Sequence, residues 1–330
     1  MEVSILTEEE IKPLLKMDEV LAAVEQAFVE KSNGRTQMPA KSYIIFKSHY
    51  GDFRTMPAYL EDSDVAGVKI VNVHPRNPRK YNLPTVMATI VLLNPRNGAP
   101  ECIMDGASIT AMRTGAAGGI AVKYLARRAS SSVGIIGAGA QAETQLLAVR
   151  EVLPSLNEVK IADKFIGRSR EYARKMRKRI ELSITPVKEV KDAVIDSDVV
   201  VTVTPSNSPV VKSSWVDEGV HINAIGADAP GKQELDPEIL KRGKIIVDDV
   251  EQATHSGEIN LSISNGFLNV GDIYAEIGDI ITGKKKGRTS DSDITIFDST
   301  GLAIQDVATA WTIYKKVKKA EKWLSYEFND

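Results

Sequence analysis

The sequence predicts an α/β protein in which a doubly wound parallel sheet is joined to a second, α+β domain with an antiparallel or mixed sheet. After residue 130, short apolar runs alternate with helical patterns, and the run at 198–204 is apolar almost throughout, as in a strand covered on both faces. Between residues 41 and 105, by contrast, five strand patterns follow one another without a long helix. A chain of 330 residues can bury two cores. We therefore expect one domain from residues 1–117 with 303–330, and another from residues 118–302.

The composition narrows the class of protein. Apolar residues make up 43% of the chain, charged residues 26%, and the net charge is -2, so we expect a globular protein without a nucleic-acid partner. The single Cys102 cannot form an intramolecular disulfide, and four scattered histidines give no metal-site spacing, so no metal is expected. The N-terminus is acidic, and no eighteen apolar residues run together. We expect a cytoplasmic protein without a membrane partner.

The first third of the chain is predicted to form the α+β domain. A strand at 3–6 precedes Thr7-x-x-Glu10, a capping-box pattern for a short helix, and Asp18 is expected to cap a second helix that stops near Gly34. An Asn-Pro-Arg-Asn-Gly turn at 94–98 predicts a hairpin. The strands are expected at 42–46, 53–58, 65–73, 85–93 and 99–104.

The remaining elements are predicted to form the parallel sheet and its connections. A long helix at 107–128, rich in small residues, is expected to bridge the domains. A last helix at 302–322 carries an apolar stripe and is expected to dock on the N-terminal domain. The strands are expected at 131–136, 158–162, 182–185, 198–203, 220–225, 244–248 and 294–297.

The stretch SSVGIIGAGAQA at residues 131–142 predicts a strand, a tight turn and a helix. Gly137 allows the sharp turn, Gly139 lets a pyrophosphate approach the backbone, and Ala142 keeps the helix close to the strand. Glycine-rich turns are common, but the next strand ends in Asp163, where a carboxylate would meet the ribose hydroxyls of a dinucleotide. The pattern thus predicts a Rossmann-type, NAD-binding domain, although the cations that follow, Lys164 and Arg168, leave some tolerance of NADP open.

Four side chains stand out as candidates for chemistry. Lys69 interrupts an apolar strand; it is either a buried amine that exchanges protons near neutral pH or a lysine that extends to solvent at a strand edge. Asp228 follows a parallel strand, at the edge where ligands bind, or else it caps a turn. Arg54 and Arg113 interrupt apolar stretches and suit a carboxylate ligand, or else form structural ion pairs.

With these positions in view, the chain resembles the ornithine cyclodeaminase and mu-crystallin family over nearly its whole length, and within it the archaeal-type alanine dehydrogenases. The motifs that carry the resemblance are RTMP at 54–57, GVK at 67–69, HP at 74–75, LPTV at 83–86, MD at 104–105, RTGAA at 113–117, GAGAQ at 137–141, NAIGADAPGKQE at 223–234 and FDSTG at 297–301.

The resemblance implies an NAD-dependent homodimer that acts on an amino or keto acid, with the N-terminal domain and C-terminal helix forming the substrate and dimerisation region. It implies that Lys69 transfers protons beside the substrate, that Asp228 is a second acid or base, and that Arg113 contacts substrate and cofactor. Together with the glycine turn, it implies cofactor contacts from Ala140, Gln141, Asp163, Lys164, Thr204, Ala224, Ile225, Gly226, Lys232 and Ser299.

One departure from the family pattern bears on the substrate. Cyclodeaminases that take ornithine resemble one another in an acidic residue two positions before Met-Pro, where this chain has Arg54. A cation there would repel the distal ammonium of ornithine and could hold a carboxylate, together with Lys69. The resemblance then implies reversible oxidative deamination of L-alanine to pyruvate and ammonia. The alternatives are ornithine or lysine cyclodeamination with recycled NAD, ketimine or imine reduction, and dinucleotide binding without catalysis.

Overall fold

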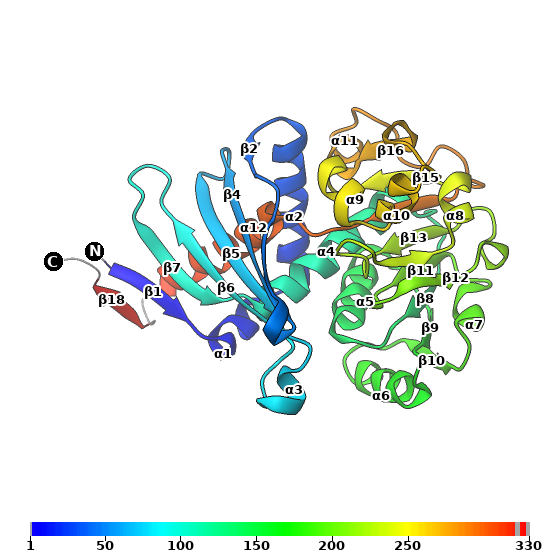
Figure 1. Cartoon of the computed structure of the whole chain (residues 1–330), viewed down its shortest axis with the longest axis horizontal. Helices are drawn as coiled ribbons and strands as arrows, with labels where there is room; N and C mark the ends of the chain where they lie inside the picture. The colour runs from blue at the N-terminus through cyan, green and yellow to red at the C-terminus, as the bar shows by residue number, and fades with distance from the viewer. Residues whose placement is uncertain (1, 321–323, 328–330) are drawn as a thin grey trace. The chain divides into compact units, whose positions relative to one another are not determined.

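The computed structural model describes residues 2–320 and 324–327, which divide into two compact units. Unit 1 comprises residues 1–113 with 302–330, and unit 2 comprises residues 114–301. The division falls inside α4 (Ala107–Leu125), the predicted bridging helix, which ends three residues before the predicted end (Figure 1).

Unit 1 is built on a mixed sheet, in agreement with the prediction. Its strands follow the order β18-β1-β7-β6-β5-β4-β2, and β3 also pairs with β4. β1 is parallel to β7, whereas the pairs from β7 through β4 are antiparallel. The hairpin turn at 94–98 joins β6 to β7 as predicted, with Gly98 at a φ of 75°. The strands are β1 (Glu2–Leu6), β2 (Thr36–Gln37), β3 (Ser42–Phe46), β4 (Gly51–Leu60), β5 (Val65–Val73), β6 (Val86–Leu93), β7 (Pro100–Asp105) and β18 (Ser325–Glu327).

Two long helices cover one face of this sheet. α2 (Met17–Ser32) packs on α12 (Ala303–Ala320), and α12 packs on β4, β5 and β6, which confirms that the last helix docks on the N-terminal domain (Figure 1). The prediction that Asp18 caps α2 is wrong: Lys16 is the N-cap, and Asp18 lies in the first turn, where its charge favours the helix dipole. The shorter helices are α1 (Glu8–Ile11), η1 (Lys12–Leu14), η2 (Lys47–His49) and α3 (Asn77–Lys80).

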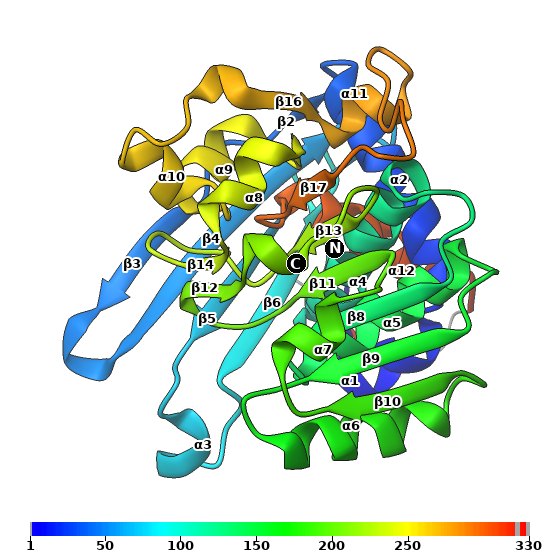
Figure 2. The ribbon, with the colours of Figure 1, turned by 90° about the vertical axis from the view of Figure 1, so that its right-hand side faces the viewer.

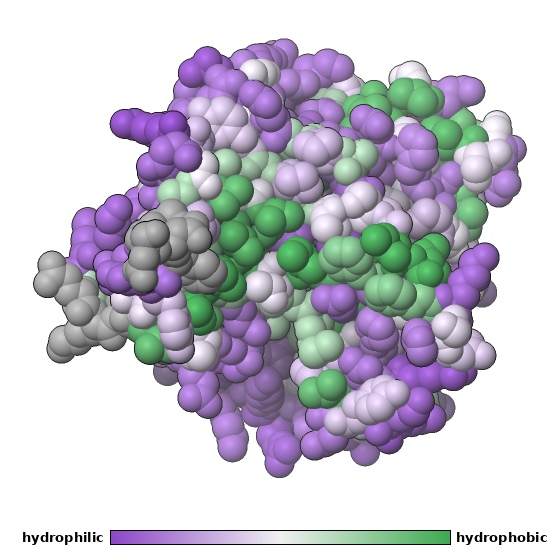
Figure 3. All heavy atoms as spheres, turned by 60° about the vertical axis from the view of Figure 1, so that its left-hand side comes forward, coloured by the Kyte–Doolittle hydropathy of each residue, from purple (hydrophilic) through white to green (hydrophobic). Residues whose placement is uncertain are grey.

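The opposite face of the same sheet carries an apolar row. The strand registers place Pro57, Val68, Val91, Ile103 and Ile5 side by side across five strands, and each is half-buried. This row alternates with residues such as Gly67, which faces α12. Figure 3, which brings forward the left-hand side of Figure 1, shows hydrophobic residues gathered in a band between hydrophilic ones.

Unit 2 contains a parallel sheet in the order β10-β9-β8-β11-β13-β17-β15-β16, as the doubly wound prediction requires (Figure 2). The edge strand β16 and the small β12-β14 sheet escaped prediction. The strands are β8 (Ser132–Ile136), β9 (Glu158–Ala162), β10 (Ser183–Val187), β11 (Val199–Thr202), β12 (Asn207–Val211), β13 (His221–Ala224), β14 (Gln233–Leu235), β15 (Lys244–Val247), β16 (Ile273–Glu276) and β17 (Thr295–Asp298).

The central strands of unit 2 are covered on both faces, because every residue of β8, β11, β13 and β17 is buried. Strand order reverses at β8, whose neighbours are β9 and β11, and this reversal is where α/β sheets bind ligands. Along residues 2–320 and 324–327, no helix is long and apolar enough to cross a membrane. The helices are α5 (Ala140–Val152), α6 (Ile166–Arg177), α7 (Val190–Val194), η3 (Ser213–Trp215), α8 (Pro237–Arg242), α9 (Val250–Ser256), α10 (Asn260–Ser264), η4 (Val270–Asp272) and α11 (Ile277–Ile281).

Candidate active site

The glycine turn of unit 2 connects β8 to α5. Gly137 has a φ of 103°, and a Cβ atom there would lie 2.8 Å from the Val203 carbonyl oxygen, so this position requires glycine. Gly139 is the N-cap of α5 with a φ of -95°, and a Cβ atom there would meet no atom within 4 Å. The turn therefore leaves open space beside the first amides of α5, where the backbone can receive a phosphate.

The loops that follow neighbouring strands line one edge of the sheet. After β9, an Asp163 carboxylate oxygen accepts a 2.9 Å hydrogen bond from the Ala138 amide of the glycine turn. A Cβ atom on Gly226, after β13, would lie 2.2 Å from the Thr204 carbonyl oxygen, which follows β11. The Ser299 amide, after β17, donates to the Ala224 carbonyl oxygen at 3.1 Å. The structure thus brings five segments that carry predicted cofactor residues to one edge.

A buried carboxylate, Glu234, joins two of these loops. It accepts hydrogen bonds from the Thr204 amide at 2.6 Å and from the Gly226 amide and Thr202 hydroxyl, each at 2.8 Å. Burial raises its pKa against the lowering effect of these bonds. Glu234 lies within the motif at 223–234, but no role was predicted for it from the sequence. The available signal was its place at the end of the long 223–234 motif, beside a parallel-strand edge.

Asp228 and Lys232 lie together in the loop after β13. The Lys232 Nζ is 2.5 Å from an Asp228 carboxylate oxygen, and the Asp228 side chain is 41% exposed. The predicted second acid or base is therefore open to solvent and paired with a predicted cofactor residue.

The other predicted cofactor residues differ in how they could contact a ligand. Ala140 and Lys164 are exposed, and Gln141 is half-buried next to Thr144. Ala224 and Ile225 are buried, so any cofactor contact from them would come from the backbone. Arg168 lies 4.0 Å from Asp163 and is largely exposed.

Two further carboxyl groups are buried behind this edge. Burial raises the pKa of Asp298, the last residue of β17, to about 8, and its Oδ2 accepts a 3.2 Å bond from the Ile259 amide. Burial and then the charge of Glu234 raise the pKa of Glu258 well above its ordinary value. Glu258 accepts bonds from the amides of Glu234 and Leu235. Among the residues that the structure describes, no group of three or more His, Cys, Asp or Glu side chains could hold a metal ion.

Replacement of Asp298 by asparagine should flatten the pH dependence of stability. Because the folded pKa is raised, the folded protein keeps a proton that the unfolded chain releases, so stability falls as pH rises from about 4 to about 8. One such proton contributes at most about 1.4 kcal/mol per pH unit. Urea unfolding at pH 5 and pH 7 should show a smaller decline for Asp298→Asn than for wild type. If stability declined equally in Asp298→Asn and wild type, the raised pKa of Asp298 would be contradicted. The same holds if the exposed control Asp291→Asn showed an equally reduced decline.

In unit 1, the structure buries the amine of Lys69. The side chain is 1% exposed, and its Nζ lies 2.6 Å from Oδ2 of Asp306 on α12. Asp306 Oδ1 also accepts a 2.8 Å bond from Nε of Arg113, which is itself buried. Burial, followed by repulsion from Arg113, lowers the pKa of Lys69 to about 7, although Asp306 raises it. The alternative prediction, a lysine that extends to solvent at a strand edge, is therefore wrong. The buried amine can exchange protons near neutral pH.

Arg54 lies on the same face of the sheet as Lys69. The register pairs Met56 with Lys69 directly, and Arg54 is two residues from Met56 on the same side of β4. Its guanidinium makes a two-point contact with Asp52, at 2.9 and 3.1 Å, and lies over the Tyr43 ring. Neither Asp52 nor Asp306 was predicted as a site residue, because carboxylates near a strand end or within a helix have no distinctive spacing in the sequence.

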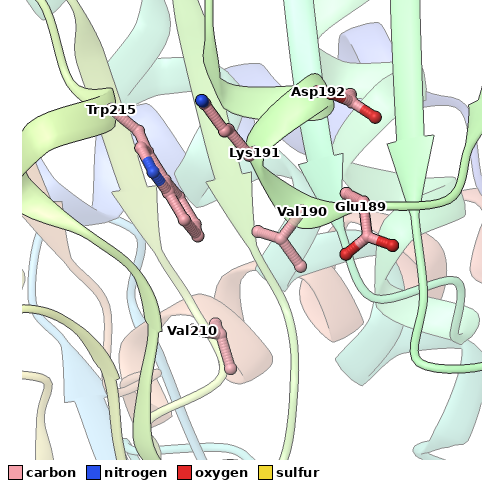
Figure 4. Close-up of a pocket in the computed structure, with 6 residues that line it drawn as sticks. All are labelled: Glu189, Val190, Lys191, Asp192, Val210 and Trp215. Carbon is pink, nitrogen blue, oxygen red and sulfur yellow. The ribbon is translucent and has the colours of Figure 1, made fainter.

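A surface pocket in unit 2 contains none of the predicted residues. It is lined by Glu189, Val190, Lys191, Asp192, Val210 and Trp215. Figure 4 shows the Trp215 ring and the Glu189 carboxylate on opposite sides of Val190. Val190, Val210 and Trp215 also pack against the hydrophobic core of unit 2. The pocket is therefore a surface depression between side chains that stabilise the fold.

Comparison with known proteins gives this geometry a context. The chain is 53% identical to alanine dehydrogenase of Archaeoglobus fulgidus over 96% of this chain and 95% of the relative. It matches the solved structure of an archaeal alanine dehydrogenase dimer with bound NAD at a TM-score of 0.95 and 51% identity, with 100% of both chains covered. It also matches Δ1-pyrroline-2-carboxylate reductase of Thermococcus litoralis in complex with NADH and L-proline, at a TM-score of 0.94 and 40% identity over 98% and 99% of the two chains. The model of the ornithine cyclodeaminase/mu-crystallin family matches residues 1–321, and the chain belongs to that family.

Proposed function

We propose that the protein catalyses NAD-dependent oxidative deamination of L-alanine to pyruvate and ammonia, and the reverse amination. The observation that carries the proposal is the buried cluster of Lys69, Arg113 and Asp306, in a chain 53% identical to an alanine dehydrogenase. A buried amine with a pKa of about 7 suits proton exchange with an amino or imino group at neutral pH.

We propose NAD as the cofactor, held along the loop edge of unit 2. The open space at Gly139 can admit the pyrophosphate, and Ala140 and Gln141 begin the helix that would face it. Asp163 can accept bonds from the adenosine ribose hydroxyls, while its charge would repel the 2′-phosphate of NADP. When bound, NAD supplies the acceptor for the hydride that leaves the α-carbon of the substrate. Thr204, Gly226, Lys232 and Ser299 are proposed to complete the contacts.

The charges in unit 1 favour a substrate with one carboxylate. When Lys69 is protonated, the three cations Lys69, Arg113 and Arg54 exceed the two carboxylates Asp306 and Asp52 by one positive charge, on a largely buried surface. A substrate carboxylate would neutralise it, bound by Arg54, Lys69 and Arg113. Lys69 would move a proton at the amino or imino nitrogen, and Asp228 would act as a second acid or base toward water or ammonia.

The same positive charge argues against ornithine and lysine, because a distal ammonium would enter a region that already has excess cations. The second candidate is reduction of a cyclic imine that carries a carboxylate. The Thermococcus litoralis relative favours it, and the same lysine and arginine residues would serve.

The test is NADH formation by the purified protein with NAD and L-alanine, beside reactions with L-ornithine and L-proline. Sustained NADH with alanine alone supports the proposal. Ammonia from ornithine without net NADH would identify a cyclodeaminase, and NADH with proline alone would identify an imine reductase. Absence of turnover with all three would refute the assignment to amino-acid oxidation.

We also propose a homodimer formed through the apolar row of unit 1. The row places Pro57, Val68, Val91, Ile103 and Ile5 on a sheet face opposite α12, and the archaeal relative of known structure is a dimer. A second copy of the chain could bury this face against itself, as two-fold symmetry allows. The single, buried Cys102 suits a reducing cytoplasm, which we propose as the location.

Replacement of Val91 by lysine should convert the dimer to a monomer. Val91 is in the middle of the row, and burying an unpaired ammonium in an apolar interface is unfavourable. Sedimentation velocity should give a single species of half the wild-type mass. The control is Val270→Lys, which changes an exposed valine of unit 2 and should leave the mass unaltered. A dimeric Val91→Lys protein would show that the row is not the interface.

A further inference from the structure

The carboxylate of Asp306 contacts two cations at once. Its Oδ2 lies 2.6 Å from Lys69 Nζ, and its Oδ1 lies 2.8 Å from Arg113 Nε. The three side chains come from β5, α12 and α4, and Asp306 is fully buried. Each carboxylate oxygen is thus directed to a different group, which fixes the separation between the amine and the guanidinium.

The fold supports this arrangement at two further points. A Cβ atom on Gly67 would lie 3.3 Å from Val307 and 2.7 Å from the Val91 carbonyl oxygen, so glycine allows α12 to approach β5 closely two residues before Lys69. Gln305 Oε1 accepts a 2.9 Å bond from Arg113 Nη1 and a 3.3 Å bond from the Leu302 amide at the start of α12. The first turn of α12 therefore holds Arg113 through two adjacent side chains.

We propose that Asp306 is a positioning residue, which holds Lys69 and Arg113 together so that both can serve the same substrate. This inference rests on the proposed function of the site. Two buried cations repel each other, and one carboxylate between them offsets that repulsion. The residual positive charge then remains for the substrate carboxylate.

Among the charged groups around Lys69, Asp306 shifts the pKa of the amine in the opposite direction to its neighbours. Arg113 from α4 and Lys41 before β3 favour the neutral amine, whereas Asp306 favours the protonated one. The Arg54–Asp52 pair of β4 shares the same sheet face and has no net charge. Loss of the Asp306 charge should therefore lower the pKa of Lys69 further, whether Lys69 acts as an acid or as a base.

The experiment compares Asp306→Asn and Asp306→Glu with wild type in alanine oxidation across pH. Asp306→Asn keeps the shape but loses the charge, and we expect kcat/KM to fall about 10²-fold, because a small misplacement of reacting groups has such an effect. The Lys69 inflection in the pH profile should move to lower pH by at least about one pH unit. Asp306→Glu keeps the charge and should return the inflection toward that of wild type.

The matched control is Asp198→Asn, which removes another ion-paired carboxylate, one that lies 2.5 Å from Arg127 in unit 2. It should leave the pH inflection in place even where it lowers stability. If the role of Asp306 were purely structural, Asp306→Asn would likewise leave the pH inflection unmoved while its activity fell. That result, or wild-type activity, would overturn the proposal.

A second measurement does not depend on the substrate. Carbon-13 NMR of protein labelled with [ε-13C]lysine follows the titration of Lys69, whose signal is assigned by its loss in Lys69→Arg. We expect the midpoint to fall in Asp306→Asn and to recover in Asp306→Glu. If wild type does not oxidise alanine, the proposed function fails, and this titration still decides whether Asp306 controls the charge of Lys69. An unmoved midpoint would overturn the inference even in an active enzyme.

Discussion

Replacement of Lys69 by alanine is expected to abolish amino-acid turnover while NAD binding persists. Loss of a positioned acid or base lowers rates by about 10²–10⁴-fold, and Lys69 also contributes one of the cations proposed to hold the substrate carboxylate. The fold should tolerate the change, because Asp306 keeps its ion pair with Arg113. Steady-state NADH formation, fluorescence titration with NAD and thermal unfolding measure the three quantities separately.

Two further variants sharpen this test. Lys69→Met retains the length of the side chain without its charge and should be as inactive as Lys69→Ala. Lys123→Ala removes an exposed lysine of α4 and should retain wild-type kcat. Turnover within a few-fold of wild type in Lys69→Met would contradict the proton-transfer role, and loss of NAD binding in Lys69→Ala would place the residue in cofactor binding instead.

Substitution of the two turn glycines by valine should separate cofactor binding from stability. At Gly139 a Cβ atom would meet no protein atom within 4 Å and the φ of -95° suits any residue, so we expect Gly139→Val to fold normally. Its side chain would occupy the space proposed for the pyrophosphate, and we expect NAD affinity to fall at least about 100-fold. At Gly137, the φ of 103° and the 2.8 Å approach to the Val203 carbonyl oxygen should make Gly137→Val both unstable and unable to bind NAD.

For both variants, isothermal titration calorimetry measures the affinity for NAD, and thermal unfolding measures the stability. The expected result is a melting temperature near that of wild type for Gly139→Val and a lower one for Gly137→Val. Wild-type NAD affinity in a well-folded Gly139→Val protein would show that the pyrophosphate does not approach this turn.

The parallel sheet was predictable because its signals are local. β8 and β11 are short, mostly apolar runs, and β8, β9, β11 and β13 were each expected within two residues of their observed bounds. β16 was missed because it contains Tyr274 and Glu276 at a half-buried sheet edge and lacks a continuous apolar run. β12 contains Pro209, and β12 and β14 pair over only a few residues, which makes them weak patterns as well.

The site was predictable only in part, for a physical reason. Lys69 and Arg113 stand out because a cation is rare in an apolar run. Their carboxylate partner does not, since Asp306 lies in the first turn of a helix, where acidic residues are common. Only the docking of α12 on the sheet brings Asp306 to Lys69. Similarly, Glu234 gains its role from the meeting of two loops that are distant in the sequence.

The order of the chain has a consequence for how unit 1 forms during synthesis. Asp306 is 193 residues beyond Arg113, with unit 2 encoded between them. At typical translation rates of 5–20 residues per second, about 10–40 s pass between synthesis of the cation and of its partner. The sheet of unit 1 must wait through that interval without α12, with its future interior open to chaperones and to other nascent chains. Unit 2, which is continuous in sequence, can fold first and leave the N-terminal segment to close last.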